Sequence, residues 1–467
     1  MGVSIRYPSK RKKTVKLNEF FHAPDSRIDP SFIPARPSDC YNFALNSGAL
    51  KDGFGIKPLS FSSAPSAPTE ISGKTIKKAY FYRKFDADEN SYDDQLLVWC
   101  QSGELYKLSL NGGSAFVLLN KTFDSAPKGL NYRLNGEDVF IFSDENAVVV
   151  YDGTNFFSYT APQITSMCMH AERLFVTTGG EETTLWFSDN FDPTNWYVSL
   201  DAAGFIDFRD GLGKVDRVID FDGKVFVFRD VGITRLQGYL DQQEFYAESV
   251  PVAKEKIYSD TVTDCGKRVI YLTAGGFYSF DGYNAVRIMP ELDGFLKGVD
   301  NGGSHGVYHN GNFYCSVKLN MGKTVETRVV CYNVTDKRFY LAKGFSPDDM
   351  LHIPDREDKL LFVTEGKLGE IDELSRYFGV PLRKVWRNNP GSFGVAGEKI
   401  LQKINLATDG DLTVRIASDY GEKVVNVKGS DIVGTYPVGL KGNKFSVTIE
   451  SRIVGAAVSD VSIVLLY

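Results

Sequence analysis

The sequence predicts an all-β protein built around a divergent β-propeller. Three observations support this fold class. Stretches with helical periodicity are scarce, and short alternating apolar runs separated by Gly, Asn and Asp occur throughout the 467 residues. An aromatic content of 13%, with 33 Phe, 24 Tyr and 44 Gly, favours strands and tight turns. A strand–turn–strand unit also recurs about every 35–50 residues, which is the period of propeller blades.

Seven segments contain this unit, in which an apolar strand is followed by a turn and a second strand. They are 94–110, 134–159, 172–199, 221–238, 264–288, 308–341 and 356–372. A blade of four short strands cannot bury both of its faces alone, so blades must stack around an axis. We therefore expect about seven blades, and counts of six or eight also fit the pattern.

Two regions fall outside the repeat. Residues 1–75 show few strand patterns and much Pro and Ser, which indicates an extended N-terminal arm and linker. The propeller is expected over residues 76–375. Residues 376–467 alternate apolar and polar positions with turns between them, which predicts a separate C-terminal β-sandwich. The boundary is expected near residues 372–381, where a short helix is also compatible with the sequence.

The third repeat ends in an unusual loop that is rich in Asp, Asn and aromatic residues. Asp189 and Asn190 can form turns with their own backbone, and Pro193 fixes the next turn. We expect Trp186 and Trp196 to pack between blades. A structural role is therefore favoured over a dedicated binding site, although a sugar site remains an alternative.

Charge argues against general nucleic-acid binding, because the formal net charge is −6. The local exception is the N-terminus, which we treat as a candidate docking arm for an acidic partner or DNA. Its six basic residues are Arg6, Lys10, Arg11, Lys12, Lys13 and Lys16. The alternative is a solvated chain end with no specific role.

The six cysteines occur at positions 40, 100, 168, 265, 315 and 331, and none forms a CxxC pair. This irregular spacing predicts free thiols in a protein that folds in a reducing cytosol, with Cys100, Cys168 and Cys315 within apolar runs. No secretory signal and no long apolar run is visible, so we expect no membrane segment and no exit by the secretory pathway.

Catalytic and metal motifs are not found. His305 and His309 have helical spacing, but the segment between them is strand-like and no HExxH motif is present, so no metal site is expected. The acidic loop with Asp86, Asp88 and Asn90 lacks the Gly and Glu that a calcium loop requires. No phosphate-binding loop or nucleophile elbow occurs, and nothing selects a carboxylate pair for glycoside hydrolysis. We therefore predict no catalytic residue, no metal and no cofactor.

One segment before the repeats has a specific character. Residues 36–59 contain Asn42, then Ser47-Gly-Ala-Leu50, and then Asp52-Gly-Phe-Gly55. This segment resembles the opening of tail hub, nozzle and packaged-DNA stabilisation proteins of tailed bacteriophages. Residues 172–199, 385–399 and 437–451 are also similar to phage structural proteins of this kind. It departs from the usual pattern at Lys51-Asp52-Gly53, where Arg-Pro-Gly is common, so the subfamily stays open.

The resemblance implies a divergent propeller in a non-enzymatic virion structural protein. Such a hub or nozzle extends or closes the portal channel and retains or conducts packaged DNA. The implied partners are further copies in a ring, six by resemblance, portal or adaptor proteins, tail fibres or a needle, and passing DNA held without sequence specificity. The implied location is the virion tail, assembled in the host cytoplasm. The alternatives are a receptor- or glycan-binding tail component and, less favoured, a propeller glycoside hydrolase.

Overall fold

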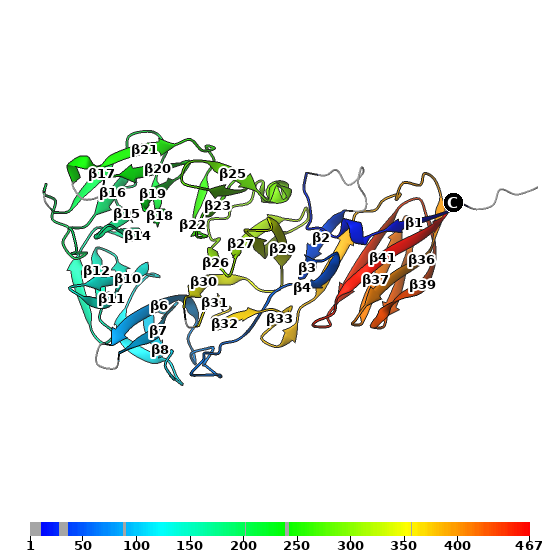
Figure 1. Cartoon of the computed structure of the whole chain (residues 1–467), viewed down its shortest axis with the longest axis horizontal. Helices are drawn as coiled ribbons and strands as arrows, with labels where there is room; N and C mark the ends of the chain where they lie inside the picture. Colours follow the sequence, from blue (N-terminus) through cyan, green and yellow to red (C-terminus); the bar gives the residue numbers. More distant parts are fainter. Residues whose placement is uncertain (1–10, 28–35, 87–89, 201, 239–241, 356) are drawn as a thin grey trace, which may run out of the picture.

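The computed structural model describes residues 11–27, 36–86, 90–200, 202–238, 242–355 and 357–467. These residues form two bodies, a β-propeller and a β-sandwich, which lie side by side along the longest axis of the molecule (Figure 1). The all-β fold class and the propeller predicted from the sequence are confirmed.

Each of the first four blades is a sheet of four antiparallel strands that follow one another in the chain. Blade one contains β6 (Ile76–Asp86), β7 (Ser91–Cys100), β8 (Glu104–Ser109) and β9 (Val117–Thr122). Blade two contains β10 (Gly129–Leu134), β11 (Glu137–Asp144), β12 (Ala147–Tyr151) and β13 (Phe156–Thr160). Blade three contains β14 (Ile164–His170), β15 (Arg173–Thr178), β16 (Thr184–Phe187) and β17 (Gly204–Asp207). Blade four contains β18 (Val215–Phe221), β19 (Lys224–Arg229), β20 (Gly232–Gln237) and β21 (Tyr246–Val250).

The last three blades complete the ring. Blade five contains β22 (Ile257–Asp264), β23 (Val269–Thr273), β24 (Phe277–Phe280) and β25 (Ala285–Ile288). Blade six contains β26 (Gly306–His309), β27 (Asn312–Asn320), β28 (Val325–Asn333) and β29 (Arg338–Ala342). Blade seven contains β30 (Pro347–Ile353), β31 (Lys359–Thr364) and β32 (Lys367–Asp372). Its fourth strand, β5 (Gly55–Pro58), comes from before blade one and pairs antiparallel with β32.

The ring closes on itself because the first strand of every blade contacts the first strand of the next, and β30 contacts β6. Each of the seven repeats found in the sequence lies in its own blade. Closure by β5 covers the edge that β32 would otherwise expose. The N-terminal segment therefore takes part in the last blade of the propeller.

The sandwich consists of two sheets. One sheet holds β3 (Phe43–Asn46), β4 (Ala49–Asp52), β41 (Val458–Leu466), β36 (Lys399–Thr408) and β39 (Ser430–Gly442), with β1 (Lys12–Lys16) also paired to β41. The other holds β2 (Pro37–Tyr41), β35 (Lys384–Asn388), β40 (Phe445–Ser451), β37 (Leu412–Ser418) and β38 (Glu422–Val427). One apolar core lies between the sheets, and Trp386 packs edge-on against Phe21 in it.

The structure corrects the expected arm and linker over residues 1–75. In the described part of this region, β1 to β4 belong to the sandwich and β5 belongs to blade seven. These strands have four or five residues each, and β3 and β4 form a local hairpin. The strands that β1, β2, β4 and β5 join lie some 300 or more positions away in the sequence, so no local pattern reveals that pairing. The chain from Leu59 to Ala67 then buries apolar side chains in the core between blades seven and one.

The region near residues 372–381 also differs from expectation. It contains no helix. A short hairpin of two-residue strands, β33 (Arg376–Tyr377) and β34 (Val380–Pro381), extends the sheet of blade seven there. The helical turns among the described residues are η1 (Asn18–Phe20), η2 (Gln242–Glu244), η3 (Pro290–Leu292) and α1 (Asp293–Leu296). None of these described helices is long or apolar enough to cross a membrane.

Aromatic side chains fill the spaces between blades. Tyr80 of blade one contacts Phe140 and Phe142 of blade two edge-on, and Phe226 of blade four does the same with Phe280 of blade five. Such pairs bury large apolar areas and prefer this geometry. The high aromatic content of the sequence therefore serves mainly to hold neighbouring blades together.

The cysteines are all free. Five are buried and Cys168 is partly exposed, so the expectation of free thiols matches the structure. Burial raises the pKa of Cys40 to about 12 and that of Cys100 to about 11. Such thiols stay protonated and behave as small apolar groups in the core.

Candidate functional site

The predicted docking residues fall into two groups. Arg6 and Lys10 lie outside the described residues, whereas Arg11, Lys12, Lys13 and Lys16 are described. Lys12 and Lys16 are exposed on β1, which is an edge strand of the sandwich. Lys13 donates a hydrogen bond to the carbonyl of Gly394 at 3.2 Å. The described part of the basic segment is thus a strand of the sandwich sheet, and its exposed lysines lie on the sandwich.

Asn42 connects the two domains at the turn between β2 and β3. Its backbone is left-handed, with φ at +59°, and its side chain is nearly inaccessible. Its Nδ2 donates to the carbonyls of Lys343 (2.8 Å) and Arg383 (2.9 Å), and its Oδ1 accepts from the amide of Lys343 (2.8 Å). Its amide also donates to the carbonyl of Leu341 in blade six. One residue therefore bonds the sandwich, blade six and the chain that leaves blade seven.

A buried ion pair reinforces this junction. Arg328 in β28 of blade six donates to Asp39 in β2 of the sandwich at 2.8 Å, and its other terminal nitrogen contacts Glu326 at 2.9 Å. Arg328 is fully buried, and its guanidinium lies over the ring of Tyr41. A guanidinium with two carboxylate partners is well compensated, which offsets the cost of removing it from water.

A second buried pair lies nearby, between Lys384 at the start of β35 and Asp52 at the end of β4. Lys384 also donates to the carbonyl of Ala456 at 3.0 Å, and Asp52 accepts from the amide of Gly455 at 2.8 Å. Burial lowers the pKa of Lys384, although Asp52 opposes that shift. Both side chains of the pair are almost fully buried, and the pair links the two sheets of the sandwich.

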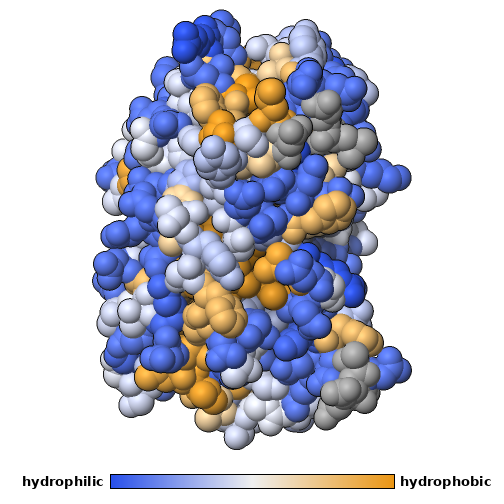
Figure 2. All heavy atoms as spheres, turned by 90° about the vertical axis from the view of Figure 1, so that its left-hand side faces the viewer, coloured by the Kyte–Doolittle hydropathy of each residue, from blue (hydrophilic) through white to orange (hydrophobic). Residues whose placement is uncertain are grey.

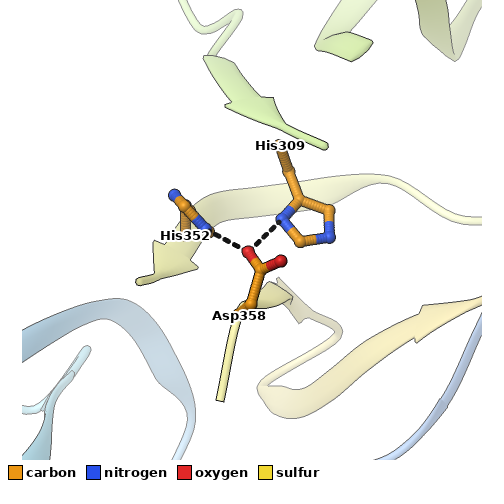
Figure 3. A group of neighbouring side chains, drawn as sticks. All are labelled: His309, His352 and Asp358. Atoms are coloured by element: carbon orange, nitrogen blue, oxygen red, sulfur yellow. Dashed lines mark hydrogen bonds and ion pairs between the residues drawn. The ribbon is translucent and has the colours of Figure 1, made fainter. Parts of the chain in front are cut away.

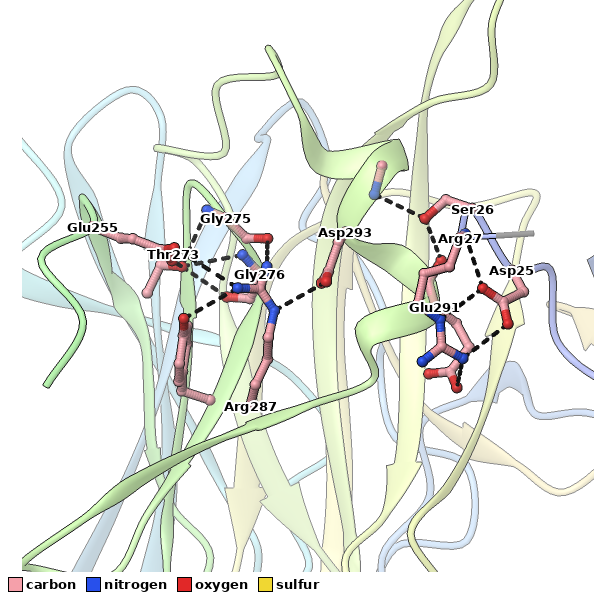
Figure 4. A network of polar contacts seen from close by, with 12 residues as sticks. Asp25, Ser26, Arg27, Glu255, Thr273, Gly275, Gly276, Arg287, Glu291 and Asp293 are labelled. Carbon is pink, nitrogen blue, oxygen red and sulfur yellow. Dashed lines mark hydrogen bonds and ion pairs between the residues drawn. The ribbon is translucent and has the colours of Figure 1, made fainter. Parts of the chain in front are cut away.

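The chain before β2 contacts the propeller a second time (Figure 4). The amide and hydroxyl of Ser26 donate to the carbonyl of Glu291 at 2.8 and 2.7 Å, and the amide of Gly294 donates back to that hydroxyl. Arg27 pairs with Asp25 at 2.9 Å and with Glu291 at 2.7 Å. The N-terminal segment thus binds the helical turns that follow blade five, and the sandwich is attached to blades five, six and seven.

The propeller axis is crossed by charged side chains. Lys128 at the start of blade two forms an ion pair with Asp260 of blade five at 3.1 Å, and these blades are not neighbours in the ring. Burial alone would raise the pKa of Asp260, but Lys128 and Arg217 outweigh it and lower that pKa to about 2. The pair thus connects two blades that are not neighbours in the ring.

One face of the propeller carries an acidic cavity beside this pair. Its volume is about 630 Å³, and both Lys128 and Asp260 line it. The other ionisable residues in its wall are Asp124, Asp144, Glu145, Glu182, Lys214 and Asp216. Burial raises the pKa of Asp216, and nearby Asp230 raises it further. Carboxylates therefore outnumber lysines in the wall of this cavity.

A histidine cluster lies where the first two strands of blades six and seven turn (Figure 3). His309 ends β26, His352 is near the end of β30, and Asp358 lies in the turn before β31. The Oδ1 atom of Asp358 is 3.0 Å from Nε2 of His352 and 3.6 Å from Nδ1 of His309. The ring centroids of the two histidines are 5.0 Å apart. Of the two histidines singled out in the sequence, His309 belongs to this group and His305 does not.

Sequence reasoning missed the cluster because its members come from different blades. His309 and His352 are far apart in the sequence, and only the propeller register brings the ends of β26 and β30 together. One weak sequence feature pointed to the cluster: both histidines lie near the end of the first strand of two successive repeats. The calcium-type loop, by contrast, includes Asp88, which lies outside the described residues.

In the aromatic loop after β16 the side-chain turn is made by Asp192, and not by Asp189 or Asn190 as expected, since Asp189 accepts from the adjacent amide of Asn190. Oδ1 of Asp192 accepts from the amide of Thr194 at 2.9 Å, and Asn195 donates to Asp189 at 2.8 Å. Trp186 and Trp196 pack against the cluster between blades two and three, as predicted. The same loop leaves Tyr197 77% exposed and Leu200 72% exposed, which the sequence pattern did not indicate.

Apolar side chains are also exposed on the outer strands of blades one to five. Each fourth strand contributes one that is 47% to 61% exposed: Leu118, Phe157, Phe205, Tyr246 and Val286. We call these five residues the apolar rim. Figure 2 shows the side of the propeller that faces away from the sandwich, where apolar patches lie among hydrophilic residues. The five residues of the apolar rim lie on five different blades, so they are spread along the outer edges of the propeller.

Comparison with known proteins finds only distant structural similarity. No protein-family model and no curated protein matches the chain. Among solved structures, BBS1N in complex with ARL6DN is 12% identical, with a TM-score of 0.45, over 70% of this chain and 97% of that chain. YCF48 is 10% identical, with a TM-score of 0.39, over 68% and 97% respectively.

Proposed function

We propose that this chain is a non-enzymatic structural protein of a virion, a tail hub or nozzle that extends or closes the portal channel. The observation that carries the proposal is the role of residues 36–58. The segment that resembles phage hub proteins forms β2 to β5 and joins the sandwich to the propeller through Asn42. A part that bears load during DNA packaging and ejection needs such a stiff joint between its domains.

DNA would pass through a ring of copies and not through one propeller. The Lys128–Asp260 pair occupies the propeller axis, so each copy acts as a solid wall element. A net charge of −6 and the acidic cavity keep phosphate binding weak, which lets a duplex slide without sticking. By resemblance, six copies would form the ring.

Two surfaces are available for assembly. The apolar rim fits contact with a neighbouring copy, because buried aromatic and aliphatic groups provide most interface energy. The exposed Lys12 and Lys16 fit an acidic surface on a portal or adaptor protein, where their charges would mainly steer association. Tail fibres or a needle would bind elsewhere on the ring, in a tail assembled in the host cytoplasm.

The first test reads the DNA that flanks the gene. Portal, capsid and adaptor genes beside it would support the proposal, and mass spectrometry of purified particles should then find the chain in the tail. Flanking genes for transport or sugar catabolism would overturn it. Turnover of polysaccharides by the purified chain would contradict the non-enzymatic part.

A receptor- or glycan-binding tail component is the second candidate, and the loop after β16 favours it. Tyr197 is exposed there beside a network of Asp and Asn side chains, and sugar sites often combine aromatic faces with such polar groups. Binding of the chain to an oligosaccharide array, lost in Tyr197→Ala, would support this candidate. A blank array would remove it.

A further inference from the structure

We propose that His309, His352 and Asp358 bind one divalent transition-metal ion of the zinc type and that this ion links blades six and seven. The ligand atoms of the three side chains all lie within 4.8 Å of one another. Each residue offers one donor, so the set comprises two imidazole nitrogens and one carboxylate oxygen. This inference is independent of the proposed virion role.

The spacing of the donors fits a small tetrahedral ion. Zinc binds nitrogen and oxygen ligands at about 2.0–2.2 Å, which places neighbouring ligand atoms of a tetrahedron about 3.3–3.6 Å apart. Of the two contacts of Asp358 Oδ1, the 3.0 Å distance to His352 is slightly below that range and the 3.6 Å distance to His309 is at its upper end. Only a small movement of the exposed Asp358 side chain is needed to admit the ion.

His309 provides a second, independent observation. Its side chain is only 9% exposed, and its Nδ1 atom has no hydrogen-bond partner. A buried polar atom without a partner is costly, and Nδ1 faces the carboxylate of Asp358 at a distance too long for a hydrogen bond. An ion between the two groups would satisfy both.

The donor chemistry selects the class of ion. Imidazole nitrogens suit zinc and neighbouring transition metals, whereas calcium and magnesium prefer sites made of oxygen alone. Asp358 is 61% exposed at its side chain, so ions can enter from solvent and a water molecule can take the fourth position. Asp358 has φ at +40°, a conformation that Asp and Asn tolerate better than most residues.

The position of the site gives the ion a structural role. His309 belongs to blade six, while His352 and Asp358 belong to blade seven, whose fourth strand is the separately supplied β5. A bound ion would therefore hold together two neighbouring blades where the ring is closed. Any ligand that binds only the folded chain raises its stability by mass action.

The experiment uses the full, untagged chain, freed of metal by chelation and then titrated with Zn²⁺ by calorimetry. Co²⁺ replaces Zn²⁺ in a parallel titration, because its visible absorption reports four-coordinate binding. The test variants are His352→Gln and Asp358→Asn, which change partly exposed side chains and should fold normally. His309→Gln is a third variant, and its folding is checked by circular dichroism.

The matched control is His170→Gln. His170 lies at the end of β14, in the same position within its blade as His309, and pairs with Asp220 at 3.1 Å. This pair has no third ligand in the described residues that would complete a metal group. His170→Gln should therefore bind Zn²⁺ as the unchanged chain does.

We expect one Zn²⁺ per chain, Co²⁺ absorption typical of a four-coordinate site, and a higher melting temperature with Zn²⁺. Affinity should fall by about tenfold or more in Asp358→Asn and His352→Gln, since even outer-shell losses have effects of about 10–100-fold. The proposal is overturned if the chain takes up no Zn²⁺, or if these two variants bind it as tightly as the unchanged chain.

Discussion

Arg328 of blade six and Asp39 of the sandwich form a buried ion pair at 2.8 Å that crosses from one domain to the other. The guanidinium has no exposed surface, and the Asp39 side chain is only 13% exposed. Neither charge can be rehydrated unless the domains separate, so the pair couples the stability of one domain to that of the other.

Asp39→Ala should lower the free energy of unfolding by about 3–5 kcal/mol, because it leaves the Arg328 charge buried with only Glu326 for compensation. It should also split a single thermal transition into two, one for each domain. Differential scanning calorimetry of the full chain measures both effects. Glu70→Gln, which breaks the exposed pair with Lys367, is the control and should leave the transition unchanged. A single unshifted transition in Asp39→Ala would contradict the coupling.

Asn42→Ala and Asn42→Gly together separate two contributions at the junction. Both remove the three side-chain hydrogen bonds to Lys343 and Arg383, each bond contributing about 0.5–1.5 kcal/mol. Alanine additionally has to adopt φ at +59°, which costs about 1–2 kcal/mol that glycine avoids. Urea denaturation should therefore rank Asn42→Ala below Asn42→Gly and both below the unchanged chain. Equal stability of the two variants would rule out backbone strain at this turn.

Gly55→Ala should destabilise the closure of blade seven. A Cβ atom there would lie 2.1 Å from the carbonyl oxygen of Arg376 and 2.5 Å from that of Leu374, and backbone atoms cannot move aside cheaply. We expect a loss of about 1–3 kcal/mol or more, with earlier proteolysis near β5. Gly180→Ala is the matched control, since a Cβ atom there meets nothing within 4 Å. Limited proteolysis that treats both variants alike would contradict the closure role of Gly55.

The pair across the propeller axis predicts a dependence on pH. The pKa of Asp260 falls from its ordinary 3.8 to about 2 in the folded chain. A depressed carboxylate pKa stabilises the fold above the unfolded pKa, and this contribution is lost as pH falls from about 3.8 towards 2. Asp260→Asn should therefore be less stable than the unchanged chain at pH 6, and the difference should shrink below pH 4. If the difference in unfolding free energy between Asp260→Asn and the unchanged chain stayed constant over this pH range, Lys128 would not stabilise the charge of Asp260.

The repeat pattern was a good guide to the propeller because blade strands are local. The second and third strands of each blade are joined by short turns, so their alternation and turn residues lie together in the sequence. For example, β19 and β20 of blade four both lie within the segment 221–238. Burial between blades also fixes which residues must be apolar.

The N-terminal strands and the histidine cluster could not be predicted in the same way. Lys12 pairs with Leu466, and Gly55 pairs with Asp372, so their register depends on partners at distant positions. His309 and Asp358 meet only through the ring geometry of blades six and seven. A single sequence carries no local signal for contacts of this kind. Asn42, by contrast, lies in the segment 36–59 that was singled out in the sequence.

Electron microscopy of the purified full chain tests the hub proposal most directly. We expect closed rings whose central opening is wide enough for duplex DNA. The apolar rim should be buried between neighbouring copies. A double variant, Phe157→Glu with Tyr246→Glu, places charges on that rim and should leave single two-domain particles with unchanged circular dichroism. Single particles of the unchanged chain at every concentration tested, with and without portal or adaptor proteins, would contradict the account.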